Sequence, residues 1–465
     1  MTTVAANIGV QDAGASRLKH RTLFITALGY FIAILDTTAK NVALPQIGRD
    51  LHASVSGLQW VIDGYLLVFA SLLLTAGALS DRYGGRRLFT LGMSVFGVAS
   101  LLSALAQNQA ELISAQLLAG MGAALLTPAS LALLAVTFTD LKERGRAIGV
   151  WAAVAGAGMC GGPLIGGALV TLAGWRAVFL VNIPIAAAGV ILPRLWLGES
   201  RRNPSRALDV PGQLTAVLFL SALSYGLIEG GSQGWSAAPV VGALVLAAAA
   251  LAGFVMTESL VKAPMVPLRL FRHSRFSASV FAGSTINFGT YSQMFLLALF
   301  FQAARGYGAL LTGVAELPMT LLCVALPVPA GRAVARFGPR LPLSLGLFGC
   351  GIGALALTGL TVHSPYALAV PGLAVIGLGM AFSIPSVAAA AMSGVAPTEA
   401  GAASGILNTA RNTGGVLGVS VLGTLVGARI GGQLGLALAI TAVVQILGGL
   451  AVFVFLRPAR STSVS

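Results

Sequence analysis

Charged residues, cysteines and histidines are all scarce in this sequence. Only 9% of its 465 residues are charged, whereas 56% are hydrophobic and the mean hydropathy is +0.89. Soluble domains carry about 25% charged residues, so this chain cannot cover a water-facing surface. A soluble globular domain, a disordered chain and a disulfide scaffold are therefore excluded. The composition predicts an all-α integral membrane protein that crosses the bilayer several times.

The few cysteines and histidines also limit the chemistry. Cys160, Cys323 and Cys350 lie separately in apolar runs, which favours small core residues over a disulfide framework or a metal cluster. The 4 histidines fall in tails, loops or span ends, and no HExxH, GxSxG or GxxxxGK[ST] motif occurs. We therefore expect no enzymatic activity, no metal and no cofactor. An ion gradient is favoured over ATP as the energy source.

Long apolar stretches follow one another along the chain, and each can cross the roughly 30 Å hydrocarbon core as a helix. We count 14, at about 22–44, 59–79, 88–106, 111–135, 146–170, 176–197, 211–229, 238–258, 276–302, 308–330, 341–361, 366–391, 403–427 and 434–456. The first 21 residues are polar and lack the pattern of a cleavable signal peptide.

Lysine and arginine are distributed unevenly between the loops. If both termini share one side, 22 of the 28 Lys and Arg fall on that side and 4 on the other, while Lys40 and Arg411 lie within spans. The positive-inside rule then places both termini in the cytoplasm and predicts a multi-pass protein of the inner (cytoplasmic) membrane. Topology thereby explains the net charge of +14, and nucleic acid is not expected as a partner.

An internal repeat indicates two related halves. The pattern Glu-x-Gly-x-Ala-x-Gly at 143–149 recurs at 399–405, and the glycine pair at 161–162 recurs at 414–415, with offsets of 256 and 253. Such parallel repeats are typical of transporters, whose substrate site lies near the midplane between the halves. The alternative is chance similarity between glycine-rich helices. The expected organisation is a cytoplasmic tail (1–21), an N-terminal six-helix half (22–197), a linker (198–210), a two-helix insert (211–258), a second linker (259–275), a C-terminal six-helix half (276–456) and a tail (457–465).

Three motifs resemble those of the major facilitator superfamily, specifically its fourteen-span drug:proton antiporters. They are GALSDRYGGRR at 77–87, GPLIGG at 162–167 and LDTTAKNVALP at 35–45, and the run at 299–320 also resembles antibiotic resistance proteins of this branch. The resemblance implies the major facilitator fold with 14 transmembrane helices. It also implies proton-coupled export of a small amphiphilic compound, either an antibiotic or a toxic metabolite. The partners would be this small molecule, protons and the lipid bilayer, and the family default is a monomer.

Other functions stay open at this stage. Uptake by symport is one alternative, although the span-5 motif argues against it. A non-transporting membrane sensor is another, and it would need a signalling domain or a long tail. The charge of the substrate also stays open, because intramembrane carboxylates are partly offset by Lys40 and Arg411.

The sequence departs from the family pattern at two intramembrane positions. Where the span-4 motif carries an arginine implicated in proton coupling, this chain has Gln116, and where span 1 usually has an aliphatic residue, it has Lys40. We hypothesise that Lys40 replaces the missing arginine charge. The alternative is a lysine that extends toward the outer interface. In the second copy of the 2–3 loop motif, Ala335 stands where the first copy has Asp81.

Ionisable groups inside the bilayer cost at least about 2.5–3.5 kcal/mol, so each requires an explanation. We predict that Asp36, Lys40, Asp63 and Glu316 take part in proton coupling. Burial raises the pKa of a carboxyl group and a neighbouring cation lowers it, so a group between these two effects can bind and release a proton. The alternatives are a fixed Asp36–Lys40 ion pair, an Asp63 that only reaches outer water, and a Glu316 satisfied by a local donor. Polar residues predicted to line the substrate cavity are Asn41, Gln116, Asn287, Gln293 and Arg411, and Arg411 could instead balance a carboxylate.

Two further groups of residues are expected to control conformation. The proposed gating loop holds the cytoplasmic face through Gly77, Asp81, Arg82, Gly84, Arg86 and Arg87. The antiporter motif permits close helix approach and a bend through Gly158, Gly162, Pro163, Gly166 and Gly167. A pure packing role for the second group is the alternative.

Overall fold

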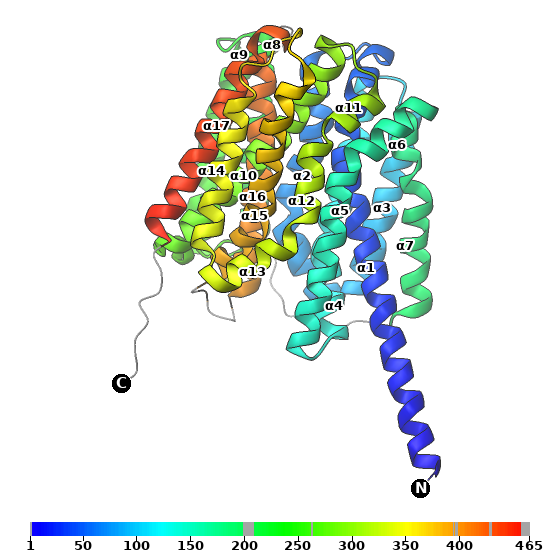
Figure 1. Cartoon of the computed structure of the whole chain (residues 1–465). Coiled ribbons are helices and arrows are strands. Elements are labelled where there is room, and N and C mark those ends of the chain that lie inside the picture. Colours follow the sequence, from blue (N-terminus) through cyan, green and yellow to red (C-terminus); the bar gives the residue numbers. More distant parts are fainter. Residues whose placement is uncertain are drawn as a thin grey trace.

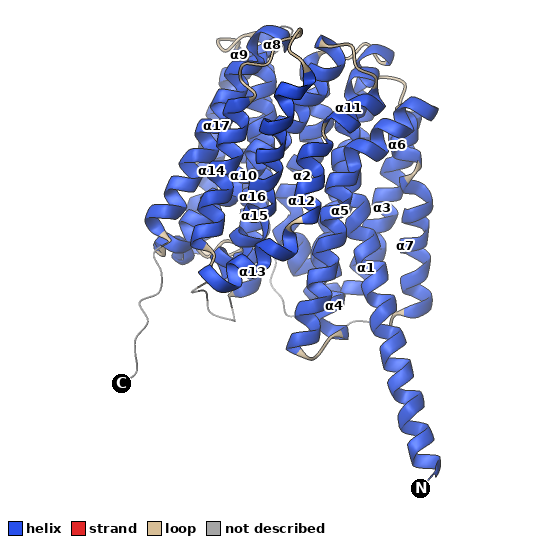
Figure 2. Cartoon of the chain, in the orientation of Figure 1, coloured by secondary structure: helices blue, strands red, loops and turns tan. Residues whose placement is uncertain are grey.

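The structure is a computed structural model, and it describes residues 2–198, 209–261, 264–393, 395, 399–426 and 430–456. Throughout this described part the chain forms helices joined by short connections and contains no strand (Figure 2). The expectation of an all-α membrane protein is confirmed at this level. Apolar side chains cover much of the helices' outer surface, as expected of a protein that faces lipid.

The first seven helices form the N-terminal part of the bundle. They are α1 (Thr2–Asp50), α2 (Val55–Tyr83), α3 (Gly85–Leu105), α4 (Gln109–Thr137), α5 (Leu141–Ala173), α6 (Arg176–Leu180) and α7 (Asn182–Trp196). Two helices follow, α8 (Val210–Gln233) and α9 (Ala238–Leu260). The polar stretch expected as an N-terminal tail is helical from Thr2 onward, because adding residues to a formed helix is far easier than nucleating a new one.

The remaining elements form the C-terminal part. They are η1 (Leu268–Arg272), α10 (Ser274–Leu299), the π-helical turn η2 (Phe300–Ala304), α11 (Ala309–Ala315), α12 (Leu317–Ala325), α13 (Pro327–Phe337), α14 (Arg340–Ala356), η3 (Tyr366–Leu368), α15 (Ala369–Met392), α16 (Ala400–Val426) and α17 (Ile430–Phe455). Prolines account for the breaks between α11 and α13, since Pro318, Pro327 and Pro329 each lack a donor for the helical hydrogen bonds.

Nine helices in the described ranges are long and apolar enough to cross a membrane. The number rises to 11 when each of two bent pairs is counted as one span. One pair is α5, bent by 42° between Glu143–Met159 and Gly161–Ala173, and the other joins Leu317–Ala325 to Val328–Phe337 at 56°. A multi-pass protein is thus confirmed.

The helices pack as two groups that resemble each other. In the first group α1 packs against α5, and α2 and α3 pack against α4. In the second, α10 packs against α16, and α12 and α14 pack against α15. The pair α8–α9 contacts the bundle through α8, which lies against α2 and α16. We refer to α1–α7 and α10–α17 as the N-half and the C-half.

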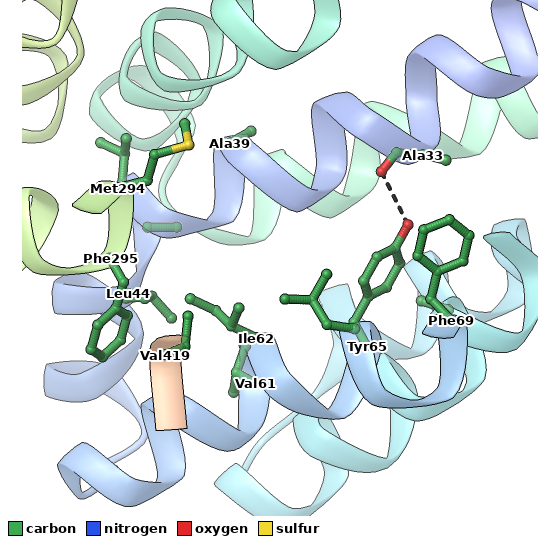
Figure 3. Packing of buried hydrophobic residues seen from close by; sticks show 14 of the residues in the cluster. Ala33, Ala39, Leu44, Val61, Ile62, Tyr65, Phe69, Met294, Phe295 and Val419 are labelled. Carbon is green, nitrogen blue, oxygen red and sulfur yellow. Dashed lines mark hydrogen bonds between the residues drawn. The ribbon is translucent and has the colours of Figure 1, made fainter. Parts of the chain in front are cut away.

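Two ends of the bundle can be distinguished in Figure 1. The first residues of α1 and the last of α17 lie at one end, which we call the terminal end, and the α8–α9 connection lies at the other, the distal end. The halves meet through α2 with α16 and through α5 with α11 and α12. Figure 3 shows part of the shared apolar core, in which Val419 of α16 lies near Ile62 of α2 and Phe295 of α10 lies near Leu44 of α1.

Candidate functional site

A lysine is completely buried inside the N-half. Lys40 lies one turn after Asp36 on α1, and its Nζ is 3.5 Å from Asp36 Oδ2. The Lys40 ammonium also donates to Gln116 Oε1 of α4 at 2.7 Å and lies 4.0 Å from the centre of the Tyr65 ring. A buried ammonium is tolerated only when its donors are satisfied, and these three contacts satisfy them.

The carboxylate of Asp36 connects this lysine to the far side of the N-half. Asn182 of α7 donates from Nδ2 to Asp36 Oδ1 at 2.8 Å and to Ser100 Oγ of α3 at 3.3 Å. Gln116 in turn donates from Nε2 to Ser103 Oγ at 2.9 Å. One polar network therefore connects α1, α3, α4 and α7 through a single buried acid, so a change in that acid's charge would be felt by all four helices.

Of the intramembrane residues Asp36, Lys40, Asp63 and Gln116, the structure brings Asp36, Lys40 and Gln116 together. Asp63 instead faces the C-half, where it accepts a 2.6 Å hydrogen bond from Ser420 Oγ of α16. Asp63 is fully buried, and its Oδ1 has no hydrogen-bond partner in the described chain.

Polar contacts around Asp63 join the halves at the distal end. Gln59, one turn earlier on α2, donates to the carbonyl oxygens of Val419 and Ser420, both at 3.0 Å. On the other side of the interface, Leu310 donates its backbone N–H to Thr171 Oγ1 at 3.3 Å. These bonds connect the two halves on both sides of their interface near the distal end.

Glu316 lies at the junction of α11 and α12 in the C-half. It is almost completely buried, and its Oε1 has no hydrogen-bond partner among the described residues. Its backbone carbonyl accepts from the amides of Met319 and Thr320, both at 3.1 Å. An unpaired buried carboxyl group is costly, so this residue calls for a ligand or a proton.

The other candidate cavity residues are placed differently from one another. Arg411 is half-buried on α16 and donates from Nε to Asn287 Oδ1 of α10 at 3.4 Å, with no ion pair to it in the described chain. Gln293 is fully buried and meets Gln445 of α17 at 3.4 Å. Asn41 is buried on α1, where its Nδ2 donates to the Thr37 carbonyl at 3.0 Å.

The glycines of the antiporter motif place α5 against two helices at once. A Cβ at Gly158 would lie 3.0 Å from the Phe31 carbonyl oxygen, and one at Gly166 would lie 2.6 Å from that of Ala39, both on α1. Gly162 touches Thr38 of the same helix. On its other face α5 meets α11, because a Cβ at Gly167 would lie 2.6 Å from the Ala309 carbonyl oxygen.

Backbone also meets backbone at Pro163, whose carbonyl oxygen lies against Gly313 of α11. The motif's small residues are therefore required for contact both within the N-half and between the halves.

The loop between α2 and α3 is a tight turn. Gly84 adopts φ 94°, which favours glycine, and its N–H closes α2 by donating to the Ser80 carbonyl at 2.9 Å. Arg86 donates from Nη1 to the Leu197 carbonyl at 2.8 Å, just past the end of α7. Arg82 lies beside the ring of Tyr83, and a Cβ at Gly77 would meet nothing within 4 Å. Asp81 lies in the last turn of α2 and Arg87 in the first turn of α3, and they complete the motif.

Sequence reasoning missed the uncharged partners of the charged residues. Asn182, Tyr65, Gln59 and Ser420 complete the polar contacts described above. An asparagine inside an otherwise apolar span was a detectable signal for Asn182. No pattern in the sequence pairs residues 63 and 420, which only the packing of α2 on α16 brings together.

A bundle of membrane-spanning helices in two similar halves, with charged groups buried inside, defines a secondary transporter. The Major Facilitator Superfamily model matches residues 26–419, and the chain belongs to this superfamily. It is therefore a transporter and not an enzyme.

Several characterised proteins are similar over most of the chain. The Methylenomycin A resistance protein of Streptomyces coelicolor is 35% identical over 473 residues, covering 100% of this chain and 99% of the relative. The protein of the same name from Bacillus subtilis is 36% identical over 463 residues, with 99% of each chain covered. Multidrug resistance protein Stp of Mycobacterium tuberculosis is 36% identical over 419 residues, covering 90% of this chain and 78% of the relative.

Proposed function

We propose that this protein is a proton-coupled exporter of a small amphiphilic antibiotic or toxic metabolite. The names of its relatives, which refer to antibiotic and multidrug resistance, support export as the direction of transport. The observation that carries the coupling is the buried Asp36–Lys40–Gln116 cluster, since a buried acid with movable partners can exchange a proton as access alternates.

The coupling step follows from the contacts of Asp36. A proton on its carboxylate cancels the attraction for Lys40, and the ammonium then relies on Gln116 and the ring of Tyr65. The hydrogen bond from Asn182 is weakened as well, because a charged acceptor binds its donor more strongly than a neutral one. Protonation thereby loosens α1 from α7 while the contact of α1 with α4 is kept, and this is the movement that we assign to the exchange of protons for substrate.

Lys40 would supply the positive charge that the fourth span lacks. Its ammonium lies within hydrogen-bond distance of Gln116, the position at which the resemblance expects an arginine. A cation reaching this point from α1 can hold Asp36 charged as one from α4 would. Lys40 on α1 would therefore supply the positive charge that an arginine at position 116 of α4 supplies in other family members.

Further roles are proposed for the remaining candidates. Asp63 and Glu316 would act as related carboxylates of the two halves, and Arg411 and Asn287 would contact substrate together with Asn41. The loop at 77–87 would gate the terminal end, and the antiporter motif on α5 would limit how the halves separate. Gln293 would serve in packing α10 against α17.

We also propose the finer topology. The 14 apolar stretches of the sequence coincide with helices or runs of consecutive helices, which supports a fourteen-span protein. The two six-helix halves and the α8–α9 insert would follow the boundaries expected from the sequence, with a monomer as the working unit. Both termini would lie in the cytoplasm, and the 2–3 loop, whose arginines lie at the terminal end, supports that orientation.

The experiment uses inside-out membrane vesicles with an acid interior and a pH-sensitive dye. Methylenomycin A, tetracenomycin C and puromycin form the test panel, because relatives carry these names. An antiporter dissipates the gradient when a substrate is added outside, whereas an uptake symporter does not.

We expect dissipation by at least one compound with the native chain and none with Asp36→Asn. Asp50→Asn is the matched control, since Asp50 also lies on α1 but binds Trp175 at the distal end. If the gradient still dissipates in folded Asp36→Asn, Asp36 has no role in coupling. If none of the three compounds dissipates the gradient with the native chain, the protein does not export these compounds in exchange for protons.

A further inference from the structure

Two acidic residues meet at the terminal end of the α8–α9 insert, and we call them the acid pair. Asp209 caps the N-terminus of α8, and Glu258 lies in the last turn of α9. Their exposed fractions are only 8% and 3%. Neither belongs to the Asp36 network or to the contacts around Asp63, so the export mechanism proposed above does not use them.

Each of the two carboxyl groups has one oxygen engaged and one without a partner. Asp209 Oδ1 accepts from the backbone N–H of Gly212 at 2.8 Å, and Glu258 Oε2 accepts from that of Val266 at 2.9 Å. Asp209 Oδ2 and Glu258 Oε1 have no hydrogen-bond partner in the described part of the chain. Leaving buried polar oxygens unpaired is costly, so the acid pair requires a ligand.

The two unpartnered oxygens lie around the same point. A Cβ at Gly212 would lie 2.6 Å from Asp209 Oδ2 and 2.8 Å from Glu258 Oε1, so both oxygens occupy the space beside this glycine. Two carboxyl groups at one buried position cannot both be charged at low cost, and one of them keeps a proton. A single proton on Glu258 Oε1, donated to Asp209 Oδ2, satisfies both oxygens and leaves both backbone contacts intact.

The helix ends decide which acid carries this proton. Asp209 lies at the N-terminus of α8, where the free N–H groups and the positive end of the helix dipole stabilise a negative charge. Glu258 lies at the C-terminal end of α9, where the dipole disfavours a negative charge. Asp209 is therefore the charged acceptor and Glu258 the protonated donor.

Neighbouring charged groups do not compensate the acid pair within the described ranges. No group of three or more side chains that could hold a metal ion occurs among these residues. No hydrogen bond or ion pair joins either acid to a charged group of the elements packed on the insert. On the terminal side of α2, α16 and η1, these charged groups are Asp81, Arg82, Arg269, Arg272 and Arg411.

The acid pair lies between segments that belong to different halves. The start of α8 is fixed to α2 of the N-half, because Gln213 donates from Nε2 to the Ser71 carbonyl at 2.9 Å. Glu258 holds the backbone of Val266, whose side chain packs into the apolar core formed by α10, α14, α15 and α16 of the C-half. A bond between the two acids therefore connects the halves through the insert at the terminal end.

We propose that Asp209 and Glu258 form a second proton-binding site, which controls this connection in response to the pH on the terminal side. With one proton bound, the acid pair holds the segment at 264–266 against the start of α8. When the proton is lost to an alkaline solution, the two carboxylates repel each other and the connection is released. The inference goes beyond the proposed export function, because this proton is not exchanged for substrate.

Infrared difference spectroscopy tests for the shared proton. Purified protein in detergent is taken from mildly acidic to mildly alkaline pH, and the C=O stretching band of protonated carboxyl groups is followed. We expect the native chain to lose such a band, and Glu258→Gln to lack it. In Asp209→Asn the band should be lost at lower pH, because the amide still caps α8 but donates to Glu258 and favours its charged form.

Two control variants show whether the band belongs to the acid pair. Glu229→Gln changes a carboxylate at the other end of α8, where it accepts from Trp60 at 3.1 Å, and it should keep the native band. Lys262 follows Glu258 by four residues in the sequence, and Lys262→Gln should also keep the band. A band that appears only in Lys262→Gln would mean that a lysine, and not a proton, compensates Glu258.

Spin labels test whether the proton controls the connection. In a background without the native cysteines, Val210→Cys and Leu260→Cys carry the labels, since both residues are exposed and lie beside the acid pair. We expect the dipolar coupling between the labels to weaken about twofold from acidic to alkaline pH, because the carboxylates then repel each other. In Glu258→Gln the amide donates to Asp209 at any pH, and the coupling should stay constant.

The proposal is wrong if the native chain loses no acid band in this pH step or if the band survives in Glu258→Gln. It is also wrong if the label coupling in the native acid pair is the same at both pH values. Neither readout requires a substrate or a proton gradient, so a failure of export with the antibiotic panel and a failure of this site are told apart.

Discussion

Lys40 is the residue whose environment is most closely defined in this protein. It is fully enclosed, yet an amide oxygen, a carboxylate and an aromatic ring surround its ammonium. Removing one partner of a buried ion pair costs about 3–5 kcal/mol, because the other charge is left uncompensated. A substitution of Lys40 is therefore expected to affect both transport and the stability of the protein, because it leaves the Asp36 carboxylate without a cation.

We predict that Lys40→Val abolishes proton-coupled transport and that adding Gln116→Arg restores it. Valine leaves Asp36 without a cation, and an arginine at position 116 would reach the same place from α4. The measurement is substrate-induced dissipation of the gradient in vesicles, normalised to folded protein. If the well-folded Lys40→Val/Gln116→Arg variant does not recover transport, Lys40 does not replace the missing arginine.

Asp63 and Glu316 illustrate how a repeated residue acquires two environments. At the repeat offset of 253, Glu316 is the counterpart of Asp63, but the repeat could not show that only Asp63 would have a hydroxyl partner. We predict that Ser420→Ala weakens the contact between the halves at the distal end, because Asp63 then loses its donor. Maleimide labelling of Thr424→Cys from the distal side should therefore increase in Ser420→Ala. It should stay unchanged in Thr215→Ala, whose hydroxyl donates only within α8.

At the level of elements, α5 shows what sequence can and cannot predict. Its glycine motif indicated close approach and a bend, and the helix does bend by 42°. The motif did not reveal that successive glycines serve different neighbours, with Gly166 on α1 and Gly167 on α11. Apolar length located the helices well, whereas partners across the interface depended on how the halves pack.

We predict that Gly166→Ala lowers the stability of the protein by about 1–3 kcal/mol, since its Cβ would overlap the Ala39 carbonyl. Gly149→Ala on the same helix is the matched control. A Cβ there meets nothing within 4 Å, and alanine is the better helix former, so stability should hold or rise. Thermal unfolding in detergent compares the two, and equal midpoints would contradict the packing argument.

Across the whole molecule, the repeat extends to the surface. Glu143 pairs with Lys19 at 2.5 Å, and its counterpart Glu399 pairs with Arg269. Lys19 lies in the N-terminal part of α1 and Arg269 lies in η1, just before α10, so each half connects its repeated glutamate to a base near its first long helix. The motif predicted the glutamates but not their partners, because the two bases lie outside it. This correspondence supports two halves built on one plan.

We predict that a disulfide between Thr171→Cys and Leu310→Cys stops transport. The Leu310 amide and the Thr171 hydroxyl are 3.3 Å apart, so cysteines at these positions should lie near bonding range and would lock the distal end closed. In a background without the native cysteines, oxidation should block flux and dithiothreitol should restore it. Each single cysteine should remain active, and full flux in the oxidised pair would contradict a distal end that opens.

The backbone contact of Pro163 with Gly313 has a mechanical consequence. With no side chain between α5 and α11 at that point, the two helices cannot slide apart there without losing van der Waals contact along their main chains, yet they can still tilt. The contact would therefore act as a fulcrum, and the segment of α5 that runs from Pro163 to the terminal end would act as a lever arm (Figure 1). In the proposed coupling, a small rotation caused by one proton at α1 would be magnified at the tip of this segment, so that a chemical event deep in the bundle would open a passage for a much larger molecule.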